Sequence, residues 1–163
     1  MKTIAAVYDS HEKAIAALLE LKKSGFPTTQ LSLLGKAELK GKHIYVKAND
    51  TPEKVEMSIG IIAGTILGIL TGVGIFAVPG VGILFGAGAI LGAFAGLQGG
   101  IIAGGIAVIL STNVGMDEAD AIRYEQHLNE GKFIIFAQGD EPQLKLAQQI
   151  LHAHGLAIEI SPT

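Results

Sequence analysis

The chain has 163 residues and a net charge of −3; 49% of its residues are hydrophobic, 17% are charged, and none is cysteine. The missing cysteines exclude disulfides, thiolate metal sites and a cysteine nucleophile. No cluster of lysines and arginines is present, which argues against nucleic-acid binding, because clustered cations are needed to displace phosphate counterions.

Charged residues are distributed very unevenly along the chain. No Asp, Glu, Lys or Arg occurs in the 60 residues 57–116, so all 27 charged residues fall in the other 103. About one-quarter of the residues in that remainder are charged, as is typical of soluble domains. We therefore divide the chain into the N-terminal half of an α/β domain (1–56), an apolar insert (57–112) and the C-terminal half of the same domain (113–163).

The first half is predicted to form a strand, a helix and a second strand. Thr3–Tyr8 is a short apolar run typical of a buried strand, and Asp9–Ser10 supplies candidates for the helix N-cap. Apolar residues then recur at helical spacing up to Gly25, which favours the left-handed conformation at a helix end. Leu31–Leu34 is the next predicted strand, and His43–Lys47 alternates as an edge strand or hairpin arm does.

The insert is predicted to form a glycine-rich α-helical hairpin. Its turn falls at Pro79-Gly80, because proline does not continue a helix and Pro-Gly is a strong turn signal. The first arm, Met57–Val78, would extend about 33 Å as a helix, enough for a hydrocarbon core of roughly 30 Å. The second arm, Val81–Leu110, contains the polar Gln98 and is either one tilted span or a span with a bent continuation.

Glycines recur every four residues on both arms. Residues four apart share one face of a helix, so each arm would present a smooth groove that lets helices approach closely, as GxxxG pairs do in lipid. We expect the hairpin to self-associate through these helix-packing positions. They are Gly60, Gly64, Gly68, Gly72, Gly88, Gly92, Gly96, Gly100 and Gly104.

The second half repeats the order of the first. After a helix predicted over Asp117–Glu130, Lys132–Ala137 is typical of a strand. Asp140 with Gln143 resembles a capping box, and the helix that follows leads to a last strand at Leu156–Ile160. Two such βαβ units sharing one sheet predict an α+β fold, a ferredoxin-like plait, with the apolar hairpin inserted between its halves.

The soluble domain also restricts where the insert can lie. Both ends of the insert must be on one side of a membrane, because the two halves share a sheet. Five lysines between Lys36 and Lys54 precede the insert, whereas Pro79-Gly80 has no charge near it. The positive-inside rule therefore predicts a hairpin in the cytoplasmic (inner) membrane, with the soluble domain facing the cytoplasm.

We find no pattern that predicts catalysis. Gly72-x-Gly74 and Gly86-x-Gly88 lie inside the apolar arms and not between a strand and a helix, so they do not indicate a dinucleotide site. The five histidines do not have metal-ligand spacing. We expect no enzymatic activity, no cofactor and no metal.

Two stretches of the soluble halves resemble bacterial general-stress (heat-induced stress) proteins. They are AAVYDSHEKAIAALLELKKSGFPTTQLSLLGK and EADAIRYEQHLNEGKFIIFAQG. Many relatives of that family carry a glycine- and alanine-rich apolar stretch with a Pro-Gly turn between these parts. The resemblance covers nearly the whole chain and implies a stress-associated, non-enzymatic membrane protein, with no catalytic residues to transfer.

Three hypotheses for the function stay open at this point. The first is a membrane protein that self-associates through its glycine-zipper hairpin and scaffolds a partner. The second is a soluble homo-oligomer whose hairpins form the shared core of a shell, filament or cargo scaffold. The third is a small oligomeric pore lined by Gln98.

Overall fold

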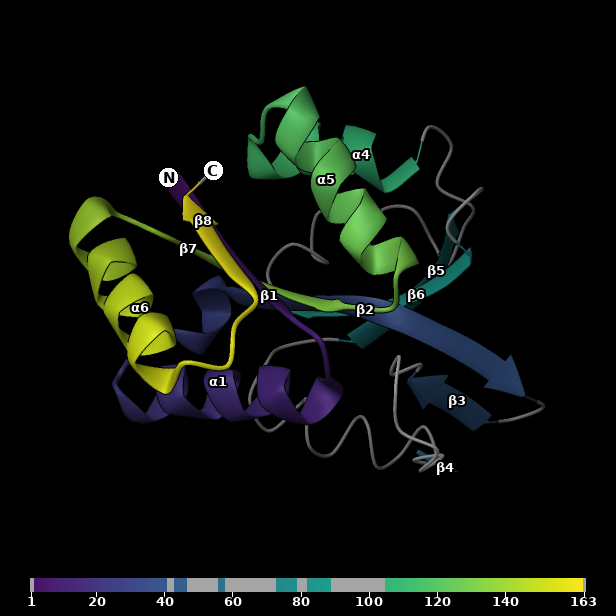
Figure 1. Cartoon of the computed structure of the whole chain (residues 1–163), viewed down its shortest axis with the longest axis horizontal. Helices are drawn as coiled ribbons and strands as arrows, with labels where there is room; N and C mark the ends of the chain where they lie inside the picture. The colour runs from purple at the N-terminus through teal and green to yellow at the C-terminus, as the bar shows by residue number, and fades with distance from the viewer. Residues whose placement is uncertain are drawn as a thin grey trace.

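The computed structural model describes residues 2–40, 43–46, 56–57, 73–78, 82–88 and 105–162. They form an α+β fold in which helices cover both faces of an antiparallel sheet (Figure 1), as the sequence predicts for the fold class. In chain order the elements are β1 (Lys2–Tyr8), α1 (His11–Lys23), η1 (Thr28–Gln30), β2 (Leu31–Lys40), β3 (His43–Val46), β4 (Glu56–Met57), β5 (Val73–Val78), β6 (Gly82–Gly88), α4 (Gly105–Ile109), a π-helical turn η2 (Leu110–Val114), α5 (Glu118–Asn129), β7 (Phe133–Gly139), α6 (Glu141–His154) and β8 (Glu159–Pro162).

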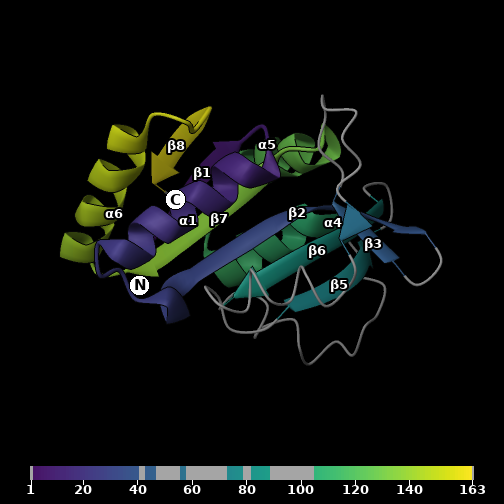
Figure 2. The ribbon, with the colours of Figure 1, turned by 90° about the horizontal axis from the view of Figure 1, so that it is seen from below.

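The centre of the sheet has the strand order β2-β7-β1-β8, and every neighbouring pair is antiparallel. The far edge of β2 is shared by two partners. Residues 32–36 of β2 pair with β6, which in turn pairs with β5, whereas residues 37–40 pair with β3. The β5–β6 hairpin therefore extends the sheet beyond β2 (Figure 2).

Helix ends follow the local signals in the sequence. The side chain of Ser10 accepts a hydrogen bond from the backbone N–H of Lys13 and caps α1. Asp140 and Gln143 form the predicted reciprocal capping box of α6, with bonds of 3.0 and 3.1 Å. Gly155 has φ of +68° and ends α6, because a residue without a Cβ adopts this conformation at little cost.

The sheet separates two hydrophobic cores. Helices α1 and α6 cover one face, and α4 with α5 covers the other (Figure 1). The buried side chains under α1 and α6 include Tyr8, Leu18, Leu21, Phe85, Phe133, Leu144 and Leu151. Those under α4 and α5 include Leu34, Leu84, Ile106, Leu110, Tyr124, Leu128 and Phe136. Tyr124 is fully buried in this second core.

The helical prediction is wrong for part of the insert. Val73–Val78 and Gly82–Gly88 are antiparallel strands, with Val78 opposite Gly82, and not the ends of two helices. Valine, isoleucine and phenylalanine in these runs favour strands, and β6 pairs with backbone groups of β2. The chain still reverses direction between them, as predicted, although Pro79 and Gly80 themselves lie outside the described residues.

Most of the predicted packing positions are not described. Of the nine glycines, only Gly88 belongs to the described chain, and it lies in β6. The other eight lie outside the described residues, as does Gln98. Within the part that is described, no helix combines the length and the hydropathy that crossing a bilayer requires.

Candidate functional site: the attachment of the charge-free segment

Residues 57–116, which hold no Asp, Glu, Lys or Arg, are here called the charge-free segment. The described fold holds this segment at its middle as well as at its two ends. Strands β5 and β6 divide it, leaving residues 58–72 between β4 and β5 and residues 89–104 between β6 and α4. These two stretches have 15 and 16 residues and no Asp, Glu, Lys or Arg. Each therefore begins and ends at an element of the described fold.

Gly88, at the end of β6, lies against the backbone of β2. Its φ is +103°, and a Cβ built on it would overlap the carbonyl oxygen of Leu31 and lie 2.8 Å from Cα of Ser32. A residue with a side chain would be strained here and would push the two strands apart. Gly88 thus permits a close approach between strands, and its predicted role in helix packing is wrong.

The C-terminal end of the segment is fastened by a carboxylate from α5. Oε2 of Glu125 accepts a hydrogen bond of 2.8 Å from the backbone N–H of Ala107, in the first turn of α4. A Cβ on Gly105 would lie 3.1 Å from the same oxygen. Helix N-termini expose N–H groups without partners and favour negative charge, so Glu125 stabilises the start of α4 from a neighbouring helix.

An aromatic cluster joins β6 to the α1 face of the sheet. The imidazole of His11 packs edge-on against Phe133 and Phe85, with centroid distances of 5.6 and 6.2 Å, and the two phenyl rings are 6.2 Å apart. Gly35 lies beneath them, where a Cβ would overlap the Phe133 ring and approach Cε1 of Phe85 to 2.9 Å. Burial lowers the pKa of His11 below its ordinary value.

A polar network joins α5 to the edge strand β8. The Glu159 carboxylate accepts from Arg123 at 2.9 Å and contacts Nε2 of His127 at 3.2 Å. Nδ1 of His127 lies 3.3 Å from Nζ of Lys132, which also pairs with Glu130. Sequence reasoning missed this group because Glu159 is 32 positions from His127, and no local spacing connects them.

The network connects α5 to β8 at the protein surface. Its positive and negative groups alternate and are partly exposed, so their contribution to stability is modest. Arg123 also lies over the ring of Tyr124, with its guanidinium carbon 5.4 Å from the ring centroid. Among the described side chains, no group of three or more His, Asp or Glu is arranged to hold a metal ion.

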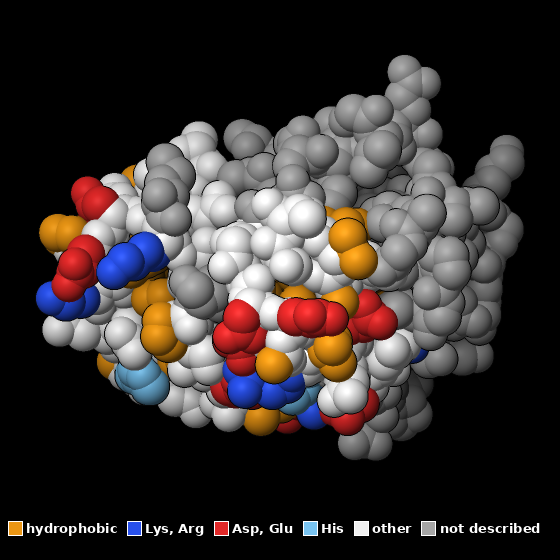
Figure 3. Space-filling model, turned by 90° about the horizontal axis from the view of Figure 1, so that it is seen from above, with side chains coloured by type: hydrophobic (Ala, Val, Ile, Leu, Met, Phe, Trp, Pro, Cys, Tyr) orange, Lys and Arg blue, Asp and Glu red, His pale blue; other side chains and the backbone are white. Residues whose placement is uncertain are grey.

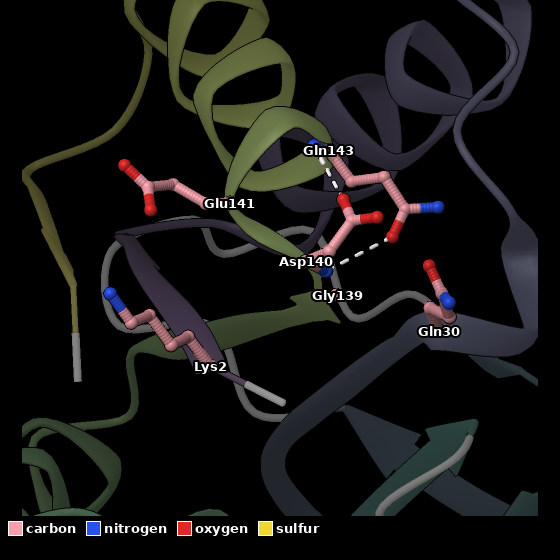
Figure 4. A pocket seen from close by; sticks show the side chains of 6 residues that line it. All are labelled: Lys2, Gln30, Gly139, Asp140, Glu141 and Gln143. Atoms are coloured by element: carbon pink, nitrogen blue, oxygen red, sulfur yellow. Dashed lines mark hydrogen bonds between the residues drawn. The ribbon is translucent and has the colours of Figure 1, made fainter.

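A shallow pocket of about 490 Å³ lies at the N-terminus of α6. Figure 4 shows its lining: Lys2, Gln30, Gly139, Asp140, Glu141 and Gln143. The Asp140 side chain is occupied by the capping box, and Glu141 forms an ion pair of 3.1 Å with Lys145. These engaged carboxylates define no general acid or base aimed into the pocket.

The surface on the α4–α5 side mixes both signs of charge. Figure 3 shows acidic and basic side chains next to one another, with hydrophobic side chains in small separate groups. Val108 on α4 and Ile122 on α5 are among the exposed large apolar residues. This face has the mixed character of an ordinary solvated surface over the area that the structure describes.

Comparison of the chain with protein-family models, curated proteins and solved structures gives no match. The resemblance to general-stress proteins therefore stays a prediction from the two sequence stretches that carry it.

Proposed function

We propose that this protein is a non-enzymatic, membrane-associated scaffold that self-associates through its charge-free segment. The observation that carries the proposal is the run of 60 residues without a charged side chain, joined to a fold of ordinary charge content. Exposing such a run to water is energetically unfavourable, so it is normally covered by lipid or by protein. The inferred place is the cytoplasmic face of the inner membrane, and the resemblance to stress proteins suggests a role under stress.

We further propose that the soluble domain is a ferredoxin-like plait. The strand order β2-β7-β1-β8 is the order that two interleaved βαβ units produce. Helices α1 and α6 cover the same face, as the crossover helices of such units do, and they contact each other. Helix α5 on the opposite face is an addition to that plan.

The position of β5 and β6 changes the expected membrane contact. A straight helix of 15 or 16 residues extends about 22–24 Å, less than a hydrocarbon core of roughly 30 Å. Each of the two apolar stretches also starts and ends at the folded domain. We therefore favour two apolar segments, 58–72 and 89–104, that enter the bilayer from the domain's side and return, over one hairpin of two full spans.

Fractionation with matched variants tests membrane association. We expect the wild-type protein to stay in the membrane pellet through a carbonate wash and to leave it only with detergent. Leu67→Asp, which charges the first apolar stretch, should move the protein to the carbonate supernatant, because a carboxylate in lipid costs about 2.5–3.5 kcal/mol. Leu19→Asp, on the partly exposed face of α1, is the control and should remain in the pellet.

A different distribution would refute the membrane assignment. Wild-type protein recovered without detergent as a large discrete particle would identify a soluble oligomer with the apolar segments in a shared core. Self-association has its own test in detergent, where Gly64→Leu and Gly96→Leu should weaken oligomers more than Ala63→Leu does. Equal oligomer stability in all three variants would remove the glycine argument.

A further inference from the structure

His11 is a buried histidine at the contact between α1 and the β5–β6 hairpin. It is the first residue of α1, and only 8% of its surface is exposed. Its ring lies against Phe85 of β6 and Phe133 of β7, and its Nε2 is buried without a hydrogen-bond partner in the described structure. This imidazole therefore serves as an apolar packing element, a role that only its neutral form can fill.

Three features of the surroundings bear on its charge. Burial among phenyl rings disfavours the protonated imidazole and lowers the pKa of His11. The positive end of the α1 dipole acts in the same direction, because His11 is in the first turn. Glu12, next to it on α1, opposes them, whereas the groups that face His11 from β6 and β7 are the uncharged rings.

Of the two strands that His11 contacts, β6 is held less firmly. Strand β7 lies in the middle of the sheet, where all seven of its residues pair with β1 and four pair with β2. Strand β6 pairs with five residues of β2 on one side, and its outer neighbour β5 pairs with no second strand among the described residues. Loss of the aromatic contact should therefore free β6 before it disturbs β7.

We propose that His11 makes the attachment of the β5–β6 hairpin dependent on pH. When the imidazole takes up a proton it leaves the contact with Phe85 and Phe133, and the hairpin loosens from β2. Because β5 and β6 carry the ends of the two apolar stretches, acid would release the middle anchor of the charge-free segment. This inference rests on the contacts of the folded domain and does not require the membrane assignment to be correct.

The direction of the pH dependence follows from linkage. In the closed state the β5–β6 hairpin is attached to β2, and in the open state it is detached. The pKa of His11 in the closed state is below its ordinary value of 6.5, so between those two pKa values the open state binds more protons. The closed state is therefore most stable above about pH 6.5 and becomes less stable as the pH falls below it. Each unit by which the pKa is lowered permits up to about a tenfold rise in the equilibrium constant for opening.

Hydrogen–deuterium exchange on the full-length protein tests the proposal. Exchange is compared at about pH 7.5 and pH 5, after correction for the intrinsic rate, on either side of the ordinary histidine pKa. We expect residues 82–88 to lose protection at the lower pH, by up to about tenfold for each unit by which the pKa of His11 is lowered, with residues 133–139 little changed. His11→Phe should abolish the response, because a phenyl ring fills the same space without titrating, and His152→Phe, at an exposed position on α6, should retain it.

Two results would overturn the proposal. One is wild-type protection of residues 82–88 that does not change with pH. The other is the same response in His11→Phe as in the wild type. If His11→Phe does not fold, the imidazole of His11 is titrated by NMR in the wild-type protein, and a pKa at or above 6.5 refutes the mechanism.

Discussion

Gly88→Ala tests the strand arrangement of the insert, because the two possible structures predict opposite signs. In a helix, replacing an interior glycine by alanine stabilises by up to about 1 kcal/mol. In β6 the same change forces φ of +103° on a residue with a side chain, at about 1–3 kcal/mol, and drives its Cβ into the backbone of β2, at about 1–3 kcal/mol more. The net expected loss is about 2–5 kcal/mol.

Gly82→Ala provides a matched control for backbone strain. Gly82, at the start of β6, has the same φ of +103°, but a Cβ added to it would meet no atom within 4 Å beyond its chain neighbours. Its substitution should therefore lower the free energy of unfolding by the backbone strain alone. Restriction of the unfolded chain offsets roughly 0.4–1 kcal/mol of that loss. We expect about 1–2 kcal/mol for Gly82→Ala, so the difference between the two variants isolates the contact with Leu31 and Ser32.

Thermal unfolding followed by far-ultraviolet circular dichroism measures both effects in one buffer. At about 2–4 °C per kcal/mol for a chain of this size, Gly88→Ala should lower Tm by roughly 4–20 °C, and Gly82→Ala by less. A Gly88→Ala protein as stable as the wild type, or more stable, would refute the pairing of β6 with β2. Equal losses in the two variants would refute the close approach.

Three further predictions concern single contacts. Asp140→Ala should cost about 0.5–2 kcal/mol in urea unfolding, since the backbone N–H of Gln143 loses its cap; an Asp140→Asn protein that is equally destabilised would contradict this. Glu125→Ala should speed hydrogen exchange in α4 by removing the acceptor of the Ala107 N–H, and unchanged exchange there would argue against the tie between α5 and the insert. Burial raises the pKa of Tyr124 above 10, so the unfolded state loses protons first and stability should fall as pH rises above about 10. The fall should be smaller in Tyr124→Phe than in the wild type, and an equal fall in the two proteins would contradict the prediction.

Local signals predicted the parts of the domain that depend on neighbouring residues. The Ser10 cap, the Asp140–Gln143 capping box and Gly25 after α1, with φ of +83°, each act within one turn of a helix, so their residue types suffice to locate them. The last strand was predicted at Leu156–Ile160 but is Glu159–Pro162. Its position depends on pairing with β1, where the N–H of Ile158 donates to the carbonyl of Val7, and apolar character alone does not reveal that partner.

The sequence by itself determined the α+β class, the repeated order of the two halves and the confinement of all charge outside residues 57–116. Only the tertiary structure decided that β6 joins the edge of β2, that Gly88 serves a strand contact, and that His11 is enclosed by two phenyl rings. The physical reason is the range of the interactions. Caps and helical periodicity act over a few residues, whereas sheet pairing and burial join positions that the chain keeps far apart, such as His11 and Phe133.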